Sequence, residues 1–595
     1  MMIMKQDTTI LYKVRLHDLN GHRIHVSLSI PQPHPQGQKL FLPAWIPGSY
    51  LVRDFSRQIE SIQVFNAESA APIPISKVAN HEWQCAPCDG PLRIEYVVYA
   101  WDLSVRSAHV DDSHAFFNGT SVFLGVMGQE DVACALQLEL PKNKPDWKAY
   151  TSLPASSAPH SYRAPNYDAL IDHPFEIGTP QVIAFEVYGA QHELVFTGVA
   201  PNLDLARIAA DVKKICAAQI ELFEPESKKA PFLDSSERYV FMTIITADGY
   251  GGLEHRSSTA LMTSRADLPT IHSDKTIKTK GYQDFLGLVS HEYFHTWHVK
   301  RIKPAAFAPY DLLRENHTKL LWVFEGFTSY YDELMLWRSG VIDQQTFLDR
   351  QAKVISLVQR TGGRHKQSTA ESSFDTWTRF YKQDENSPNA LVSYYSKGAL
   401  VALALDLHIQ HQSGGKHSLD DVMRLLWQRY GVDFYQGNPV GVAEDAMPAL
   451  ILAATGVDCA ALIQRCAEGR EDPPLAELFA LHNINLKPKK ANTTPVLNVR
   501  LKAQHQAVQI ATVDEHGAAH AAGLSAGDEL VAINGLRIHS AKQLDTLLSA
   551  YAAGDTVPVH VFRRDELRGY EVKLAAAAAD EYELIINDEN NAKPS

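Results

Sequence analysis

The chain has few cysteines, and this shortage limits its class and its compartment. Six cysteines among 595 residues are too few for a secreted scaffold held together by disulfides. Cys85 and Cys88 form a Cys-x-x-Cys pair, but no second pair lies at the spacing of a zinc finger. We therefore expect free thiols and a cytoplasmic protein.

The sequence also lacks an excess of basic residues over acidic ones, and it lacks long apolar runs. The net charge of −13 argues against nucleic acid as a partner, because phosphate binding needs a basic face. No run of about 18 apolar residues is present, so we expect no transmembrane segment. The N-terminus has no apolar stretch after Lys5, and therefore no signal peptide is predicted.

The first part of the chain is predicted to form β structure. Apolar and polar residues alternate over residues 10–16 and again over 24–30, with the hairpin dipeptide Asn20-Gly21 between them. Similar segments continue to about residue 189 with little helical periodicity. This pattern predicts an all-β domain over residues 1–189.

Helical periodicity dominates the next part, residues 190–486, which we predict to be a mostly helical catalytic domain. The expected helices have apolar residues at a spacing of three and four. The main ones are Leu203–Phe223, Tyr282–Val299, Lys319–Arg338 and Ser396–Gln412.

A third module is predicted after a short basic linker at residues 487–490. Alternating strands return over residues 491–580, with one short helix at 541–551. The polar tail at 588–595 is expected to be disordered. The fold class predicted for the whole chain is multidomain α+β.

The chemistry of a metallopeptidase is indicated by His291-Glu292-x-x-His295. Two imidazoles four residues apart on a helix project from one face and can bind one zinc ion. Glu292 is offset from that face, where it can accept a proton from water and return it to a leaving amine. The competing interpretation is two ordinary helical histidines.

A catalytic zinc needs a third protein ligand, and Glu325 is the best candidate. It interrupts the apolar run Trp322–Phe327, where an unpaired carboxylate would be costly. Glu333 is the weaker alternative, because Asp332 and Arg338 beside it suggest a solvated face. We expect one zinc ion per chain.

A glycine-rich strand edge lies upstream of this helix. Gly251 and Gly252 would let a substrate backbone approach and pair with the strand, and Glu254 could bind the α-ammonium group of a peptide. The alternative is a turn followed by a surface glutamate.

Together these segments resemble the M61 family of glycyl aminopeptidases, relatives of the M1 aminopeptidases among the gluzincins. The resemblance spans nearly the whole chain. It rests on these segments: Leu42–Tyr50 with Arg53–Phe55, Asp248–His255, His291–Pro304, Trp322–Tyr331 and Ser393–Gly398.

The resemblance implies an N-terminal β domain, a thermolysin-like (gluzincin) catalytic domain and a C-terminal PDZ domain. It implies zinc binding by His291, His295 and Glu325, with Glu292 as the general base. Tyr395 takes the place of an oxyanion-stabilising tyrosine, with Tyr394 as the fallback. It also implies removal of small N-terminal residues, Gly and Ala above all.

Within the last module, residues 522–535 closely resemble a PDZ core segment. A PDZ groove binds an extended peptide as an added strand, so a peptide ligand is a second expected partner. The carboxylate-binding loop would fall near residues 497–499, which contain no glycine.

Two alternatives to an aminopeptidase remain open at this point. A zinc endopeptidase would use the same chemistry, with Glu254 only structural. A PDZ peptide-binding protein with weak or no catalysis would not need Glu292, and the presence of that residue argues against it.

Overall fold

The structure is a computed structural model that describes residues 8–437, 439–489, 493–504 and 507–587. The tail predicted to be disordered at 588–595 lies outside these residues. The chain divides into two compact units. The first unit comprises residues 1–316, 331–342 and 423–443, and the second comprises 317–330, 343–422 and 444–595.

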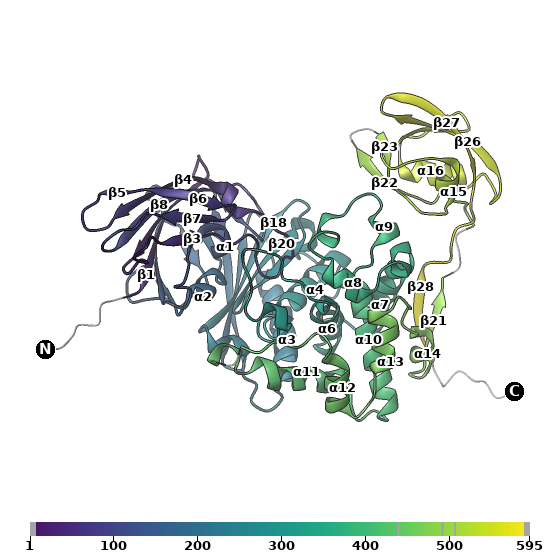
Figure 1. Ribbon diagram of the computed structural model, residues 1–595. Helices are drawn as coiled ribbons and strands as arrows, with labels where there is room; N and C mark the ends of the chain where they lie inside the picture. The colour runs from purple at the N-terminus through teal and green to yellow at the C-terminus, as the bar shows by residue number, and fades with distance from the viewer. Residues whose placement is uncertain (1–7, 438, 490–492, 505–506, 588–595) are drawn as a thin grey trace. The chain divides into compact units, whose positions relative to one another are not determined.

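The N-terminal part of the first unit is built from three β-sheets, as the alternating pattern predicts (Figure 1). The largest has seven strands in the order β14 (Ser161–Ala164), β12 (Cys134–Glu139), β1 (Ile10–Asp18), β2 (Arg23–Ile30), β8 (Leu92–Tyr99), β4 (Ile59–Asn66) and β5 (Pro72–Ile73). One four-stranded sheet runs β13 (Lys148–Tyr150), β15 (Phe175–Gly178), β10 (Ala115–Phe117) and β9 (Ala108–Val110). The other runs β11 (Gly125–Val126), β3 (Lys39–Phe41), β7 (Glu82–Cys85) and β6 (Ile75–Ala79). Two short helices, α1 (Gly119–Val122) and α2 (Tyr167–Ile171), interrupt the strands.

A mixed five-stranded sheet follows in the same unit. Its order is β16 (Gln181–Val187), β17 (Ala190–Thr197), β18 (Arg238–Thr246), β20 (Ser258–Ser264) and β19 (Gly251–Glu254). Its buried residues continue the apolar core of the N-terminal sheets, through side chains such as Val240 and Met242. The predicted boundary at residues 189 and 190 falls in the turn between β16 and β17, where Val187 pairs with Ala190.

Two long helices of the first unit accompany this sheet. They are α3 (Leu205–Phe223) and α4 (Lys280–Phe294), which pack against each other. Helix α4 also contacts β19 and β20, so the helix that carries the paired histidines lies beside the glycine-rich strand.

The second unit contains most of the remaining helices. They are α5 (Leu321–Phe324), the first turns of α6 (Gly326–Arg338), α7 (Gln344–Gln359), α8 (Thr369–Phe374), α9 (Ser387–Ala390), α10 (Ser396–Gln412), α12 (Met447–Thr455), α13 (Ala460–Ile463) and α14 (Leu475–Ala480). Helix α11 (Leu419–Leu426) passes from the second unit into the first. None of the helices in the described part of the chain is long and apolar enough to cross a membrane.

The C-terminal module of the second unit has the predicted β character. Its sheet runs β22 (Val499–Gln504), β23 (Ala507–Val513), β24 (Glu529–Ile533), β26 (Thr556–Arg563) and β27 (Glu566–Lys573), with β25 (Leu536–Arg537) paired to β24. Two helices pack with it in Figure 1, α15 (Ala518–Ala522) and α16 (Ala541–Leu548). The sequence predicted only the second of these helices.

The prediction of a basic linker at 487–490 is wrong for residues 487–489, the part of it that the structure describes. Residues Ile484–Pro488 form strand β21, which pairs with β28 (Tyr582–Ile586). The backbone N–H of Lys489 continues this pairing by donating to the carbonyl oxygen of Glu581 at 2.7 Å. This segment is therefore one strand of a two-stranded sheet that follows the helices.

Candidate active site

The paired histidines lie at the C-terminal end of α4. Thr279 caps the start of this helix, where its side chain accepts a hydrogen bond from the backbone of Tyr282 at 3.2 Å. The helix ends at Phe294, five residues before the predicted end, so His295 is its C-cap residue. The backbone N–H of His295 still donates to the carbonyl of His291 at 3.2 Å, which keeps the two imidazoles one turn apart.

Hydrogen bonds to the two Nδ1 atoms orient both rings. Nδ1 of His291 lies 2.9 Å from a carboxylate oxygen of Asp332, and Nδ1 of His295 lies 2.7 Å from the carbonyl oxygen of His298. Both partners are acceptors, so both Nδ1 atoms carry the proton. The two Nε2 lone pairs then face each other at 3.0 Å. A cation between them would remove this repulsion, and hydrogen-bonded Nδ1 atoms are the usual arrangement of metal-binding histidines.

Asp332 is a contact of the paired histidines that the sequence does not predict. The sequence suggests a solvated face at this position, but the side chain of Asp332 is only 14% exposed and lies 2.9 Å from Nδ1 of His291. A usable signal was present, because Asp332 follows Glu325 by seven residues, which is about two helical turns. On a continuous helix, residues at this spacing project from the same face.

Glu325 lies in the second unit, where the predicted single helix is broken. It is the C-cap residue of α5 and directly precedes α6, and it is only 2% exposed. The backbone packs closely here, because a Cβ atom on Gly326 would lie 2.6 Å from the Cα atom of Gly398 on α10. This contact fixes the start of α6 and therefore the position of Glu325 directly before it.

Three buried groups gather around the strand edge in the first unit. Potential ligand atoms of Glu254, Glu292 and His295 all lie within 4.8 Å of one another. Oε1 of Glu254 is buried and has no hydrogen-bond partner among the described residues. Gly48, at a φ of +95°, leaves space for this carboxylate, since a Cβ atom there would lie 2.5 Å from Oε2 of Glu254. A buried carboxylate with an open oxygen is suited to binding a cation such as an ammonium group.

Strand β19 is the edge strand of the five-stranded sheet, and among the described strands it pairs with β20 alone. Its outer side can therefore accept an extended peptide as an additional strand. Gly252 also packs against the proposed general base, since a Cβ atom there would lie 2.0 Å from Oε1 of Glu292. Gly251 precedes it and is partly exposed.

The two tyrosines before α10 have different surroundings in the second unit. Tyr394 is fully buried, and its hydroxyl lies 2.9 Å from the hydroxyl of Thr376. Tyr395 is partly exposed, and its hydroxyl lies 3.3 Å from that of Tyr381. Burial therefore commits Tyr394 to the core, and Tyr395 is the one that solvent can reach.

A buried ionic network follows the strand edge and was not predicted from the sequence. Asp172 accepts hydrogen bonds from Arg256 at 2.9 Å, from Lys300 at 2.9 Å and from the Nδ1 of His255 at 3.0 Å. Burial disfavours the charged form of Asp172, but Lys300 and Arg256 outweigh this effect and hold its pKa well below the usual range. The network ties β19 to the segment after α4. His255 belongs to this network.

Arg301 adds a second connection between the same segments. Its guanidinium group donates to Asp234 at 2.7 Å, to the carbonyl of Thr296 at 2.7 Å and to the carbonyl of Arg256 at 3.0 Å. Asp234 and Arg256 are far from Arg301 in the sequence, so no local sequence pattern could have identified these two partners.

A second cavity lies in the C-terminal module. A cavity of about 490 Å³ is lined on one side by residues 496–499 and Leu501, and on the other by Leu544 and Leu548 of α16. The chain's own residues 577–581 also line it. The position between a strand and a helix is where PDZ domains bind an added peptide strand.

Comparisons with known proteins agree with this architecture. Residues 11–179 match the Peptidase M61 N-terminal domain, residues 284–401 match the M61 glycyl aminopeptidase and residues 495–574 match the PDZ domain. No functionally curated protein is matched by the chain.

Two solved structures illustrate the similarity. The chain is 40% identical to an aminopeptidase N family protein from Idiomarina loihiensis, with a TM-score of 0.92 and 98% of each chain covered. An M1 zinc metallopeptidase from Deinococcus radiodurans is 12% identical, with a TM-score of 0.45, and the similarity covers 79% of this chain and 95% of that one. The family models and the first of these structures show that the chain belongs to the M61 family of glycyl aminopeptidases, a family of metallopeptidases.

Proposed function

We propose that this metallopeptidase is a zinc-dependent aminopeptidase that removes small N-terminal residues such as Gly or Ala. The observation that carries the proposal is the pair of Nε2 atoms of His291 and His295. They face each other at 3.0 Å while both Nδ1 atoms are held by acceptors.

Zinc fits this donor set. Zn–N bonds of about 2.0–2.1 Å at a tetrahedral angle place two nitrogens about 3.4 Å apart, close to the distance between these imidazoles. We propose Glu325 as the third ligand, because a buried carboxylate needs a cation or donor partner and it is only 2% exposed. Two imidazoles and one carboxylate leave a fourth position open, as a catalytic zinc requires. Bound there, zinc would supply a Lewis acid that polarises the scissile carbonyl.

The chain's own residues then divide the remaining work. Glu292 accepts the proton of the attacking water and returns it to the leaving amine. The hydroxyl of Tyr395 donates a hydrogen bond to the oxyanion of the tetrahedral intermediate. Glu254, with its open buried oxygen, binds the α-ammonium group, and the edge of β19 at Gly251 and Gly252 pairs with the substrate backbone.

Recognition of the free amine separates this proposal from an endopeptidase. Hydrolysis of a peptide with a free N-terminal Ala should be compared with hydrolysis of the same peptide after N-acetylation. A charged hydrogen bond contributes about 1.5–3 kcal/mol, so we expect the acetylated peptide to lose about 10- to 100-fold in kcat/KM. Equal cleavage of both peptides would remove the role of Glu254 and favour the endopeptidase.

The preference for small residues is supported by the match to the glycyl aminopeptidase family. Among the amides of Gly, Ala, Leu and Phe, we expect the highest kcat/KM for Gly and Ala, a lower value for Leu and the lowest for Phe. The PDZ groove is proposed to bind a peptide as a separate ligand.

A further inference from the structure

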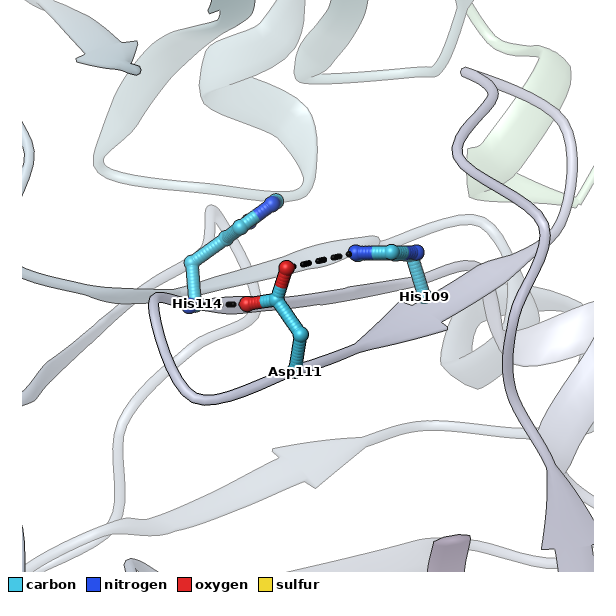
Figure 2. Close-up of side chains that lie close together, drawn as sticks. All are labelled: His109, Asp111 and His114. Carbon is cyan, nitrogen blue, oxygen red and sulfur yellow. Dashed lines mark hydrogen bonds and ion pairs between the residues drawn. The ribbon is translucent and has the colours of Figure 1, made fainter. Parts of the chain in front are cut away.

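A second cluster of metal-ligating side chains lies at the turn between β9 and β10, in the N-terminal part of the first unit. Figure 2 shows His109, Asp111 and His114 with their polar ends close together. One potential ligand atom from each lies within 4.8 Å of the others. His109 and His114 are 4% and 7% exposed, so the two imidazoles are buried, while the side chain of Asp111 is partly exposed. None of these residues takes part in the proposed peptidase chemistry.

Hydrogen bonds fix Asp111 with one oxygen turned toward the histidines. Its Oδ1 accepts from the backbone and the hydroxyl of Ser113 at 2.7 and 2.6 Å, and from the backbone of His114 at 3.0 Å. Its Oδ2 is left with a single partner, Nε2 of His109 at 3.2 Å. These hydrogen bonds outweigh the effect of burial and lower the pKa of Asp111, which is therefore a carboxylate.

A buried glutamate orients the second imidazole. Nδ1 of His114 lies 3.1 Å from Oε1 of Glu176, which is 1% exposed. This leaves Nε2 of His114 for another partner, and it has none among the described residues. A carboxylate behind a histidine in this way is the usual outer partner of a metal ligand.

Two further atoms of the cluster are unsatisfied. Nδ1 of His109 and Oε2 of Glu176 are buried without a hydrogen-bond partner in the part of the chain that the structure describes. Nδ1 of His109 can therefore carry the ring proton when Nε2 binds an ion. The cluster is also accessible, because all three residues line a cavity of about 600 Å³.

We propose that His109, Asp111 and His114 bind a divalent transition-metal ion, with zinc the best match, at a site separate from the peptidase centre. Zinc bonds of about 2.0–2.2 Å place two neighbouring ligands about 3.4 Å apart, so an ion can replace the hydrogen bond between His109 and Asp111 with little movement. Two imidazoles and one carboxylate favour such an ion over Mg²⁺ or Ca²⁺.

Titration of the metal-stripped full chain with Co²⁺, followed by its visible absorption, tests this proposal. We expect two equivalents to bind to the wild-type chain. The double variant His109→Gln with His114→Gln should bind one equivalent and keep its peptidase activity. The variant Asp112→Asn, one residue from the cluster and exposed, should still bind two equivalents.

Binding of a single equivalent by the wild-type chain would overturn the proposal, and so would two equivalents in the double variant. Should the double variant fail to fold, Asp111→Asn provides the same comparison with a smaller change. If the Asp111→Asn variant bound a second equivalent of Co²⁺ as tightly as the wild-type chain does, this result would also contradict the proposed site.

Discussion

At the scale of single residues, the account depends on which atoms of two imidazoles carry protons. Asp332 and the carbonyl of His298 fix the protons on the Nδ1 atoms of His291 and His295. The paired Nε2 atoms are then acceptors at a distance suited to a shared cation. Glu292 is one residue from His291 and therefore lies beside the proposed metal instead of binding it.

Replacing Glu292 by Gln should remove the base and leave the metal in place. General acid–base catalysis contributes about 10²- to 10⁴-fold, so we expect kcat to fall by that range. Zinc content, measured on the same preparation by elemental analysis, should not change. A variant that keeps wild-type kcat would show that another group activates the water.

Replacing Asp332 by Asn should weaken metal binding without removing a ligand. Loss of an outer carboxylate partner of a ligating histidine costs about 10- to 100-fold in metal affinity. Competition with a chelator would measure this change. Asp375→Asn, an exposed aspartate paired with Arg379, is the matched control and should behave like the wild-type chain. Unaltered affinity in Asp332→Asn would mean that His291 needs no such partner.

The placement of the candidate site residues could be predicted from the sequence in part, and the limits have a physical reason. The approach of His291 and His295 within one helical turn could be predicted because it follows from their spacing along a helix. Asp332 was misjudged, because exposure of one helix face depends on what packs against it. The cluster around His109 follows from a turn between short strands, whose register a sequence pattern does not fix.

At the scale of elements, the edge strand β19 and helix α4 act together. Gly252 lies against Glu292, where any side chain would collide with the carboxylate. The colliding atoms belong to the side chain of Glu292, which can move. The fold can therefore accommodate a side chain at position 252, but Glu292 would be displaced from its position as the general base.

Gly252→Ala should therefore reduce activity more than stability. We expect kcat to fall by at least about tenfold, because a 1 Å displacement of a catalytic group costs that much or more. The thermal unfolding midpoint should change little. Gly362→Ala is the control, since its Cβ would meet nothing closer than 3.9 Å. A Gly252→Ala variant with full activity would show that Glu292 is not held in place by this strand.

Element boundaries could be predicted less well than element types. Helix α10 has the predicted bounds, Ser396–Gln412, whereas α4 ends at Phe294 although apolar periodicity continues to Val299. Beyond Phe294 the backbone forms irregular turns, in which Ile302 donates to the carbonyl of Trp297 at 2.8 Å. Buried charges at Lys300 and Arg301 hold this segment, and periodicity does not report such ionic contacts.

At the scale of the whole molecule, buried histidines make folding depend on pH. Burial lowers the pKa of His173 and of His192 to about 4. Nε2 of His192 lies 2.9 Å from the hydroxyl of Tyr293, inside the His-Glu-x-x-His segment of α4. Protonation of such a group is compatible with the unfolded chain but not with the folded one.

Stability should therefore fall as the pH is lowered from about 6.5 to 4. An unfolded histidine has a pKa of about 6.5, so the unfolded chain binds protons in this range that the folded chain excludes. Each of the two histidines can contribute up to about 3 kcal/mol, present in full above pH 6.5. Urea unfolding at several pH values would measure the slope, which should be smaller in His192→Gln. A slope that this substitution leaves unchanged would contradict the assignment.

The central claim is that His291, His295 and Glu325 hold one zinc ion for peptide hydrolysis. The most direct test is anomalous X-ray diffraction at the zinc edge from crystals of the full chain grown with zinc. The account predicts a peak within about 2.2 Å of Nε2 of both histidines and of a Glu325 carboxylate oxygen. A peak bound to the histidines without Glu325, or no peak beside them, would contradict it.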